Sequence, residues 1–151
     1  MVVGVISDTH GLLRPEALVA LAGAEHILHA GDVGDIRILE TLREIAPVTA
    51  IRGNVDVSEA CAELPATDVV ELAGSLFYLV HSVRDLDINP VVAGVAVVVS
   101  GHSHKAGIET RDGVMYLNPG SAGPRRFQLP VTVALVTVGV DAVKARIVEI
   151  L

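Results

Sequence analysis

Short apolar runs that end abruptly in glycine or polar residues set the pattern of this chain. Each run is rich in aliphatic side chains and is followed at once by turn-forming or charged residues. Runs of this kind predict β-strands whose carboxyl ends lie where the polar residues begin. Five runs follow this pattern: VVGVIS (2–7), HILHA (26–30), PVTAI (47–51), SLFYLV (75–80) and VAVVVS (95–100).

Two stretches between the first three runs have the period of a helix. PEALVALAG (15–23) begins with a proline, which suits a first helical turn, and ends with a glycine, which suits a helix stop. In DIRILETLREIA (35–46), one face is apolar through Ile36, Leu39, Leu42 and Ile45. Because strands and helices alternate over residues 1–52, we expect right-handed crossovers and a parallel sheet.

The chain beyond residue 66 is rich in strands joined by tight turns. TDVVELAGSLFYLVH (67–81) predicts a hairpin around Ala73-Gly74, and GIETRDGVMYLN (107–118) predicts another around Asp112-Gly113. Two final strands are expected in VTVALVTV (131–138) and AVKARIVEI (142–150). No repeat or linker divides the chain, so we expect one α/β domain over residues 1–151, with two packed sheets and helices outside.

Composition and charge narrow the class of protein. Of the 151 residues, 51% are apolar but only 3% are aromatic, which favours an aliphatic core of buried sheet. The net charge of −7 argues against a general nucleic-acid surface, and no basic amphipathic stretch suits a membrane surface. The chain lacks a signal-peptide pattern, and its longest apolar runs reach about half of the roughly 20 residues that span a bilayer. Because Cys61 is the single cysteine, no intrachain disulfide can form, and we expect a soluble, cytoplasmic protein.

Polar residues at the ends of the five strands form the candidate site. The carboxyl ends of parallel strands meet at one edge of a sheet, where loops carry ligand-binding side chains. Each residue alone has a structural interpretation, since aspartate caps helices, asparagine occupies left-handed turns and histidine packs in cores. All five runs nevertheless end in potential metal ligands, which are Asp8, His10, Asp32, Asn54, His81, His102 and His104.

The chemistry of this donor set favours transition metals. Imidazole nitrogens, carboxylates and one amide oxygen suit Mn, Fe, Zn, Ni or Co better than Mg or Ca, which prefer oxygen ligands throughout. The set is larger than a tetrahedral zinc needs and suits two ions about 3.5–4 Å apart that share a carboxylate. We therefore predict two divalent transition-metal ions per chain, with Mn favoured.

The motifs and their order resemble the calcineurin-like metallophosphoesterases, specifically the small bacterial and archaeal phosphodiesterase branch. The resemblance rests on DTHG (8–11), GD (31–32), GNVD (53–56), His81, GHSH (101–104) and NPGS (118–121). It implies a two-sheet αββα sandwich with a dinuclear metal centre in which Asp32 bridges the ions. One ion would then be held by Asp8, His10 and His104, and the other by Asn54, His81 and His102.

The resemblance implies a metal-dependent phosphoesterase, most closely a phosphodiesterase, that hydrolyses a small phosphoester. No protein side chain is the nucleophile in this scheme, because a hydroxide that bridges the ions attacks phosphorus in line. The charge of the ions draws the anionic ester to the site although the whole chain is acidic. The identity of the ester, and whether the chain forms a homo-oligomer, stay open.

Two departures from the family pattern bear on efficiency and substrate range. Many relatives have a histidine after the asparagine of GNVD, where it gives a proton to the leaving group, but this chain has Val55. The proton must then come from water or a neighbour such as Asp56, or the leaving group must depart easily. Relatives also often show His-Gly-His around the fifth ligand, whereas this chain has Val80-His81-Ser82.

A non-catalytic binding scaffold on the same fold, with a structural or vestigial metal site, is the alternative interpretation. A eukaryotic retromer subunit resembles the same family, is viewed as a scaffold and also lacks the leaving-group histidine. The complete donor set favours the hydrolase, because a scaffold has no reason to keep all seven ligands.

Four further residues have weaker claims to a role in the site. Arg125 and Arg126 could hold a phosphate bidentately, although two solvated loop arginines are the simpler interpretation. His29 precedes Gly31-Asp32 on a predicted buried strand, and His26 lies farther back on the same strand. For both histidines we expect structural hydrogen bonds rather than metal binding.

Overall fold

Two five-stranded sheets carry the fold in the computed structural model, which describes residues 1–151. The first sheet has the order β10-β9-β1-β2-β3, and β1, β2 and β3 run parallel, as predicted. Its strands are β1 (Val2–Ile6), β2 (His26–His29), β3 (Val48–Ala50), β9 (Thr132–Val138) and β10 (Val143–Glu149).

The second sheet has the order β4-β5-β6-β8-β7, in which β5, β6 and β8 run parallel. Its strands are β4 (Thr67–Leu72), β5 (Ser75–Val80), β6 (Val95–Val99), β7 (Gly107–Arg111) and β8 (Val114–Asn118). The predicted hairpins are confirmed as β4–β5 and β7–β8. Both turns have the left-handed backbone of a two-residue hairpin loop, with φ of 48° and 85° at Ala73 and Gly74 and 51° and 80° at Asp112 and Gly113.

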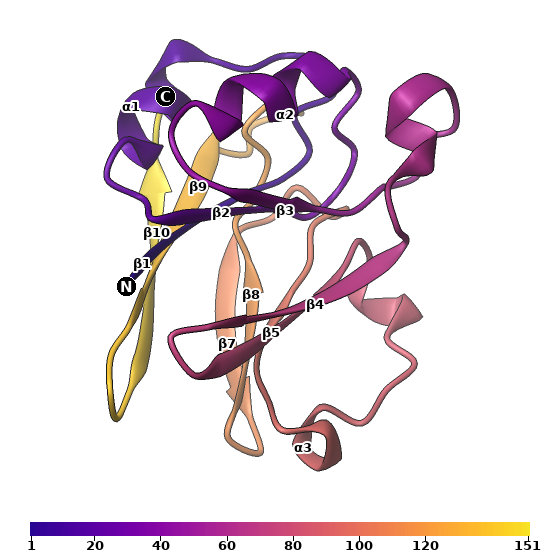
Figure 1. Cartoon of the computed structure of the whole chain (residues 1–151). Helices are drawn as coiled ribbons and strands as arrows, with labels where there is room; N and C mark the ends of the chain where they lie inside the picture. The colour runs from indigo at the N-terminus through magenta and orange to yellow at the C-terminus, as the bar shows by residue number, and fades with distance from the viewer.

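The two predicted helices, α1 (Pro15–Leu21) and α2 (Ile36–Arg43), pack on the outer face of the first sheet. Figure 1 shows both on the side of that sheet that faces away from β4–β8. Pro15 begins α1, and the Asp35 side chain caps α2 by accepting the Arg37 N–H. The sequence pattern does not predict three shorter segments, which are too short to show a period: α3 (Pro90–Ala93) and the 3₁₀ helices Glu59–Glu63 and Val83–Asp85. No helix has the length and apolar character needed to cross a membrane.

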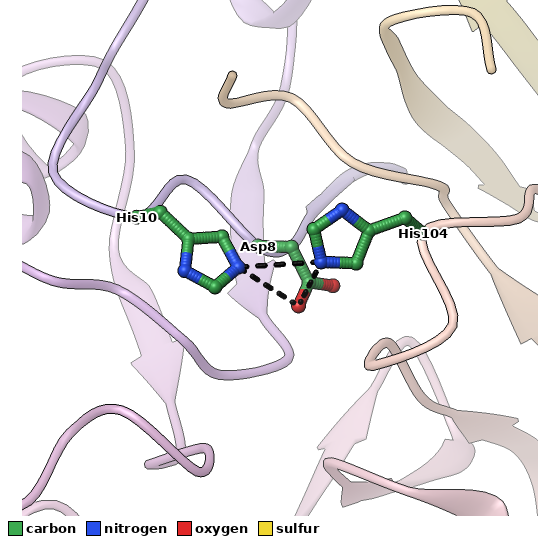
Figure 2. Close-up of side chains that lie close together, drawn as sticks. All are labelled: Asp8, His10 and His104. Carbon is green, nitrogen blue, oxygen red and sulfur yellow. Dashed lines mark hydrogen bonds and ion pairs between the residues drawn. The ribbon is translucent and has the colours of Figure 1, made fainter. Parts of the chain in front are cut away.

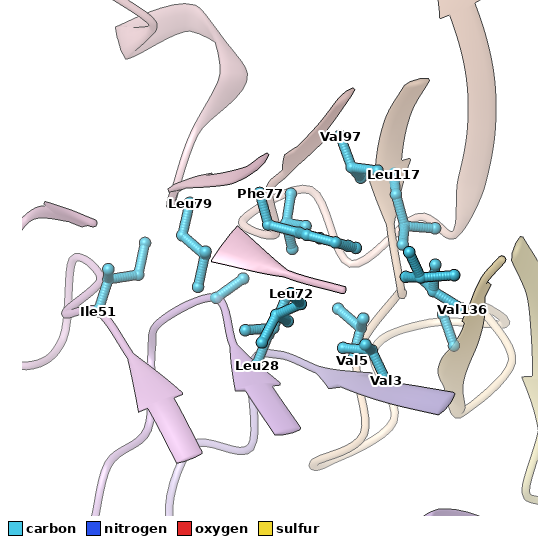
Figure 3. Packing of buried hydrophobic residues seen from close by; sticks show 14 residues of the cluster. Val3, Val5, Leu28, Ile51, Leu72, Phe77, Leu79, Val97, Leu117 and Val136 are labelled. Atoms are coloured by element: carbon cyan, nitrogen blue, oxygen red, sulfur yellow. The ribbon is translucent and has the colours of Figure 1, made fainter. Parts of the chain in front are cut away.

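The main core lies between the two sheets, and aliphatic side chains dominate it. Figure 3 shows Val3, Val5 and Leu28 of the first sheet facing the second sheet, which contributes Phe77 and Leu117 among others. All five are buried, and each fully buried side chain of this kind contributes roughly 1.5–3 kcal/mol. The predicted architecture of two packed sheets with outer helices is confirmed.

The parallel strands of both sheets carry the site. Since β1, β2 and β3 share one direction in the first sheet and β5, β6 and β8 share one in the second, their carboxyl ends gather. The polar residues that follow these strands are thereby brought together from distant parts of the sequence.

Candidate metal centre

The loops after the parallel strands hold five of the predicted ligands in a strained backbone conformation. The angle φ is 55° at Asp8, 47° at His10, 55° at Asp32, 70° at His102 and 62° at His104. Non-glycine residues rarely adopt this left-handed conformation, which costs on the order of 1–3 kcal/mol each, and they cluster at functional sites. The surrounding fold, rather than local preference, therefore fixes these side chains.

Asp8, His10 and His104 form the first of two groups of potential metal ligands. Figure 2 shows the two imidazole rings on either side of the Asp8 carboxylate, with one nitrogen of each ring turned inward. The Nε2 atom of His104 lies 3.4 Å from Asp8 Oδ1 and 3.3 Å from His10 Nε2. His10 Nε2 lies 3.7 Å from the same Asp8 oxygen. Three donor atoms from two loops thus face one point.

Asp32, His81 and His102 form the second group, and Asp32 lies next to both groups. Its Oδ2 atom is 3.0 Å from His81 Nε2 and 3.7 Å from the Nε2 atom of His10 in the first group. In each group the ligand atoms lie within 4.8 Å of one another. The grouping is the one that the family resemblance implies, with Asp32 where a shared ligand would lie. The ligand roles themselves stay a prediction.

The hydrogen bonds of His81 determine which of its nitrogens is free to bind a cation. Its Nδ1 lies 2.7 Å from the carbonyl oxygen of Ala30, and since a carbonyl only accepts, Nδ1 carries the hydrogen. The neutral ring therefore directs the lone pair of Nε2 toward the carboxylates of Asp32 and Asp8.

Buried atoms without partners test whether a metal fits this site. Asp8 Oδ1 and His81 Nε2, which both face the centre, are buried and have no hydrogen-bond partner. A lone pair and two carboxylates that face each other in a buried site repel unless a cation lies among them. The nitrogen and oxygen donors present here therefore fit divalent transition metals.

The second oxygen of the Asp8 carboxylate is held away from the centre. Its Oδ2 accepts hydrogen bonds from Ser7 Oγ at 2.7 Å and from the His102 N–H at 3.1 Å. Gly101 leaves the space for this arrangement, because a Cβ atom there would lie 2.6 Å from Asp8 Oδ2. These contacts orient Asp8 so that Oδ1 faces the imidazoles, as supporting contacts do at metal sites.

Burial and mutual contacts shift the pKa values of these groups in opposite directions. Burial raises the pKa of Asp8 and lowers the pKa of His104. Burial alone would raise the pKa of Asp32, but its contacts with His81 and the Val55 N–H hold that pKa far below its usual range. The pKa of His81 is raised, since the contact with Asp32 outweighs burial. Without metal, the lowered pKa of Asp32 and the raised pKa of His81 favour an ionised carboxylate beside a protonated imidazole ring.

Asn54 and Val55 lie at the rim of the centre. Asn54 is exposed and lines a hollow together with His81, which places it beside the second group. The Val55 N–H donates to Asp32 Oδ1 at 2.9 Å, while its side chain is 48% exposed. The assignment of Asn54 to the donor set stays a prediction, and the side chain of Val55 presents no proton donor.

Asp56 is a structural carboxylate, and its suggested role as a proton donor stays a prediction that these contacts do not favour. It is 3% exposed, and its two oxygens accept three backbone N–H groups at 2.9–3.0 Å, from Val33, Gly34 and Gly53. Both oxygens are thus used as acceptors from the backbone. Asp56 therefore joins the loop after β2 to the loop after β3.

The two loop arginines extend to different places. Arg125 donates to the carbonyl oxygen of Leu151 at 3.3 Å, at the far end of the chain. Arg126 lies near His104, where its charge adds to the effect of burial in lowering the pKa of that histidine. Arg126 is therefore the better placed of the two for a phosphate at the centre, and substrate binding by either stays a prediction.

The remaining histidines have the structural roles expected of them. His29 is fully buried, with Nε2 3.0 Å from Thr9 Oγ1 and Nδ1 accepting the Gly31 N–H at 3.2 Å. His26 Nε2 lies 2.9 Å from Thr49 Oγ1. Neither belongs to a group of potential metal ligands.

Asn118 supports the centre in a way that the sequence does not reveal. Its side-chain nitrogen donates to the Gly101 carbonyl at 3.0 Å and to Ser103 Oγ at 3.1 Å, and its oxygen accepts the Gly120 N–H at 2.9 Å. The residue thereby ties the NPGS segment to the loop that carries His102 and His104. The NPGS motif marks the position, but only the alignment of β8 beside β6 shows the contact.

This chain is similar to known proteins in both sequence and fold. The family model for the calcineurin-like phosphoesterase superfamily domain matches residues 1–141. A protein of Methanothermobacter thermautotrophicus named as a probable metallophosphoesterase is 34% identical over 147 residues, which cover 89% of this chain and 85% of that protein.

Solved structures share the whole architecture. A structure described as a novel archaeal phosphodiesterase aligns with a TM-score of 0.75 at 22% identity and covers 98% of this chain and 100% of its own. Wild-type Vps29 of Entamoeba histolytica, complexed with Zn²⁺, aligns with a TM-score of 0.72 at 22% identity, covering 99% of both chains. At this level of identity the two structures establish a common fold.

Proposed function

The chain belongs to the calcineurin-like phosphoesterase superfamily, and from this premise we propose that it is a phosphodiesterase with two divalent transition-metal ions. Mn is the favoured ion, and Fe, Zn, Ni and Co suit the same donors. The proposal assigns one ion to Asp8, His10 and His104, the other to Asn54, His81 and His102, and Asp32 to both.

The position of Asp32 is the observation that carries this proposal. One carboxylate oxygen lies 3.0 Å from His81 and 3.7 Å from His10, so it faces a ligand of each group. A site for a single ion has no use for a carboxylate between two sets of imidazoles, whereas a pair of ions needs a shared ligand.

In this proposal the chain's own residues would bind the ions and orient the ligands, and none of them would react with the ester. When bound, the ions would lower the pKa of water and stabilise charge on the phosphoryl oxygens. The Ala30 carbonyl keeps the hydrogen of His81 on Nδ1, which leaves Nε2 free for binding. The bonds from Ser7 and His102 fix Asp8 in the same way. Since Val55 offers no proton, we expect esters with good leaving groups to react best.

Hydrolysis of bis(p-nitrophenyl) phosphate by the Mn-loaded protein, with metal content measured after dialysis, tests the proposal. We expect two ions per chain and activity that is lost with a chelator and restored by Mn. The Asp32→Ala variant should lose more than tenfold in metal affinity, because it removes a contact to both ions. Asp141→Ala, which removes an exposed carboxylate that lies in the β9–β10 turn and lines no hollow, should bind and hydrolyse as the native protein does. One ion per chain, or native activity in Asp32→Ala, would contradict the dinuclear assignment.

A binding scaffold is the second candidate function. The structural likeness to Vps29 and the absence of a proton donor at Val55 favour it. A protein that binds two ions tightly but hydrolyses neither activated diesters nor activated monoesters would fit the scaffold and not the phosphodiesterase.

A further inference from the structure

Three hollows open beside the candidate metal centre, and two of them are acidic. The hollow at Asn54 and His81 carries two carboxylates, Asp85 and Asp87, against the single guanidinium of Arg52. The hollow at Val55 carries three carboxylates against one guanidinium: Asp35, Asp56 and Glu59 with Arg37, which pairs with Asp35. A phosphate ester is an anion, so both hollows disfavour it.

The third hollow has a net positive charge. It has a volume of about 260 Å³ and is lined by Ser82–Arg84, Ser100–Ser103 and Asn118. It therefore includes His102, whose exposed side chain belongs to the second group of ligands. Arg84 is its only permanently charged residue, and no carboxylate lines it. Of the three hollows, this one alone would attract the phosphate group of an ester arm that leaves the metal centre.

A larger hollow continues from the third one along the second sheet. Val83, Ser100 and Asn118 line both, so the two adjoin. The larger hollow, of about 450 Å³, is also lined by Tyr116 of β8 and by Glu109 and Arg111 of β7, strands that lie side by side in Figure 1. The Arg111 guanidinium lies 4.8 Å from the centre of the Tyr116 ring and pairs with Glu109 at 2.8 Å, so the charges there balance.

The chemistry of this groove, defined as the two hollows from His102 to Tyr116, changes along its length. Near the centre it offers the Arg84 guanidinium, the Ser82 hydroxyl and the hydroxyl of Ser103. Where the two hollows meet it offers the apolar side chain of Val83, which is 42% exposed, and at the far end it offers the ring of Tyr116. Hydroxyls and a cation suit a sugar phosphate, and an aromatic ring suits a flat heterocycle.

We propose that this groove binds the non-leaving arm of a phosphodiester and that this arm is a nucleoside. The proposal rests on the proposed phosphodiesterase function and names its substrate class. The phosphate lies at the metal centre beside Arg84, and the sugar lies against Ser82 and Ser103. Because the Arg111 guanidinium covers one face of the Tyr116 ring, the base packs against the part of this half-buried ring that stays exposed. A small alkyl arm fills none of the far hollow and gains nothing from it.

Two substrates with the same leaving group test the groove: the p-nitrophenyl ester of thymidine 5′-phosphate and methyl p-nitrophenyl phosphate. The native protein should have a higher kcat/KM for the nucleoside ester. Tyr116→Leu should lower the ratio of the two kcat/KM values roughly tenfold, the effect of losing one stacked base, and Tyr116→Phe should preserve it. Tyr78→Leu removes a half-buried tyrosine that lines no part of the groove and should leave the ratio unchanged.

Val83→Asn provides a second variant, because Val83 is exposed in a short 3₁₀ helix and its change leaves the core intact. It should lower the same ratio severalfold, whatever the effect of Tyr116→Leu on folding. An equal loss for both substrates, or no loss for either, in Val83→Asn and Tyr116→Leu alike would overturn the groove.

Binding of thymidine 5′-phosphate to the metal-free protein separates this proposal from the proposed function. The nucleotide should shift the amide resonances of Val83, Arg84 and Tyr116, and Arg84→Gln should weaken its Kd severalfold. If the native protein hydrolyses both esters but the nucleotide leaves these resonances unmoved, the groove proposal fails and the phosphodiesterase stands. If neither ester is hydrolysed but the nucleotide binds with the expected shifts, the groove stands and the catalytic proposal fails.

Discussion

At the scale of single residues, Val55 bears on which leaving groups the proposed phosphodiesterase would release. Its backbone is fixed by the hydrogen bond to Asp32, and its side chain is 48% exposed. A leaving alkoxide needs a proton in the transition state, and positioned general acids typically contribute about 10²–10⁴-fold. The neighbouring Asp56 accepts three backbone N–H groups, so we do not expect this carboxyl to supply that proton.

We therefore expect rates to fall steeply as the pKa of the leaving group rises. Val55→His should raise kcat for alkyl diesters by roughly 10- to 100-fold and change aryl diesters little, because aryl oxides leave without a proton. Val57→His is the matched control, since Val57 is 77% exposed and lies outside the hollows around the centre. Rates for a series of aryl and alkyl diesters at saturating Mn check this, and a flat dependence in the native protein would show that another group gives the proton.

At the scale of elements, alternation and turn residues predict the strands, whereas the short helices leave no pattern. The hairpins around Gly74 and Gly113 are predictable because tight loops need left-handed residues at fixed places. The candidate ligands are predictable because strand ends gather at one edge. The contact of Asn118 with Gly101 is not, since it depends on the pairing of β6 with β8 across the intervening β7 hairpin. The sequence also does not show which of Arg125 and Arg126 lies near the centre, because the path of the loop places one beside Leu151 and the other beside His104.

The bonds of Asn118 predict that it holds the loop after β6 in its strained form. Asn118→Ala removes the bonds to Gly101 and Ser103, so we expect roughly tenfold weaker Mn binding, as for other supporting residues of metal sites. Asn89→Ala is the control, because Asn89 caps α3 and its loss costs stability of about 0.5–2 kcal/mol without touching the centre. Calorimetric titration with Mn checks both variants, and unchanged affinity in Asn118→Ala would remove the residue from this role.

At the scale of the whole molecule, the fold sustains a strained and highly charged site because its two cores are extensive. Five non-glycine residues in left-handed conformations and two buried carboxylates all cost free energy. The aliphatic cores on both faces of the first sheet offset that cost. His29 is the last residue of β2 and is fully buried. Its burial affects whether the ring can carry a charge, and so links the stability of the fold to pH.

Burial lowers the pKa of His29 to about 4, and its hydrogen bonds fit the neutral ring. Its Nδ1 accepts from the Gly31 N–H, so Nε2 carries the hydrogen and donates to Thr9 Oγ1, which in turn donates to the Val33 carbonyl. In the unfolded chain the same histidine titrates near its ordinary pKa of about 6.5. Between these two values the unfolded chain binds a proton that the folded protein does not, and unfolding is favoured as the pH falls.

We therefore expect the metal-free protein to lose roughly 2–3 kcal/mol of stability through His29 between pH 7 and pH 4.5. About one pH unit or more above 6.5 the ring is neutral in both states and contributes almost nothing to the pH dependence. His29→Gln keeps groups that can accept from Gly31 and donate to Thr9 but removes the titration. Between pH 7 and pH 4.5, its free energy of unfolding, measured in urea, should therefore fall by roughly 2–3 kcal/mol less than that of the native protein. His26→Gln should recover far less, because His26 is only half-buried and its pKa is less strongly lowered. An identical pH slope in the native protein and in His29→Gln would mean that other groups cause the acid sensitivity.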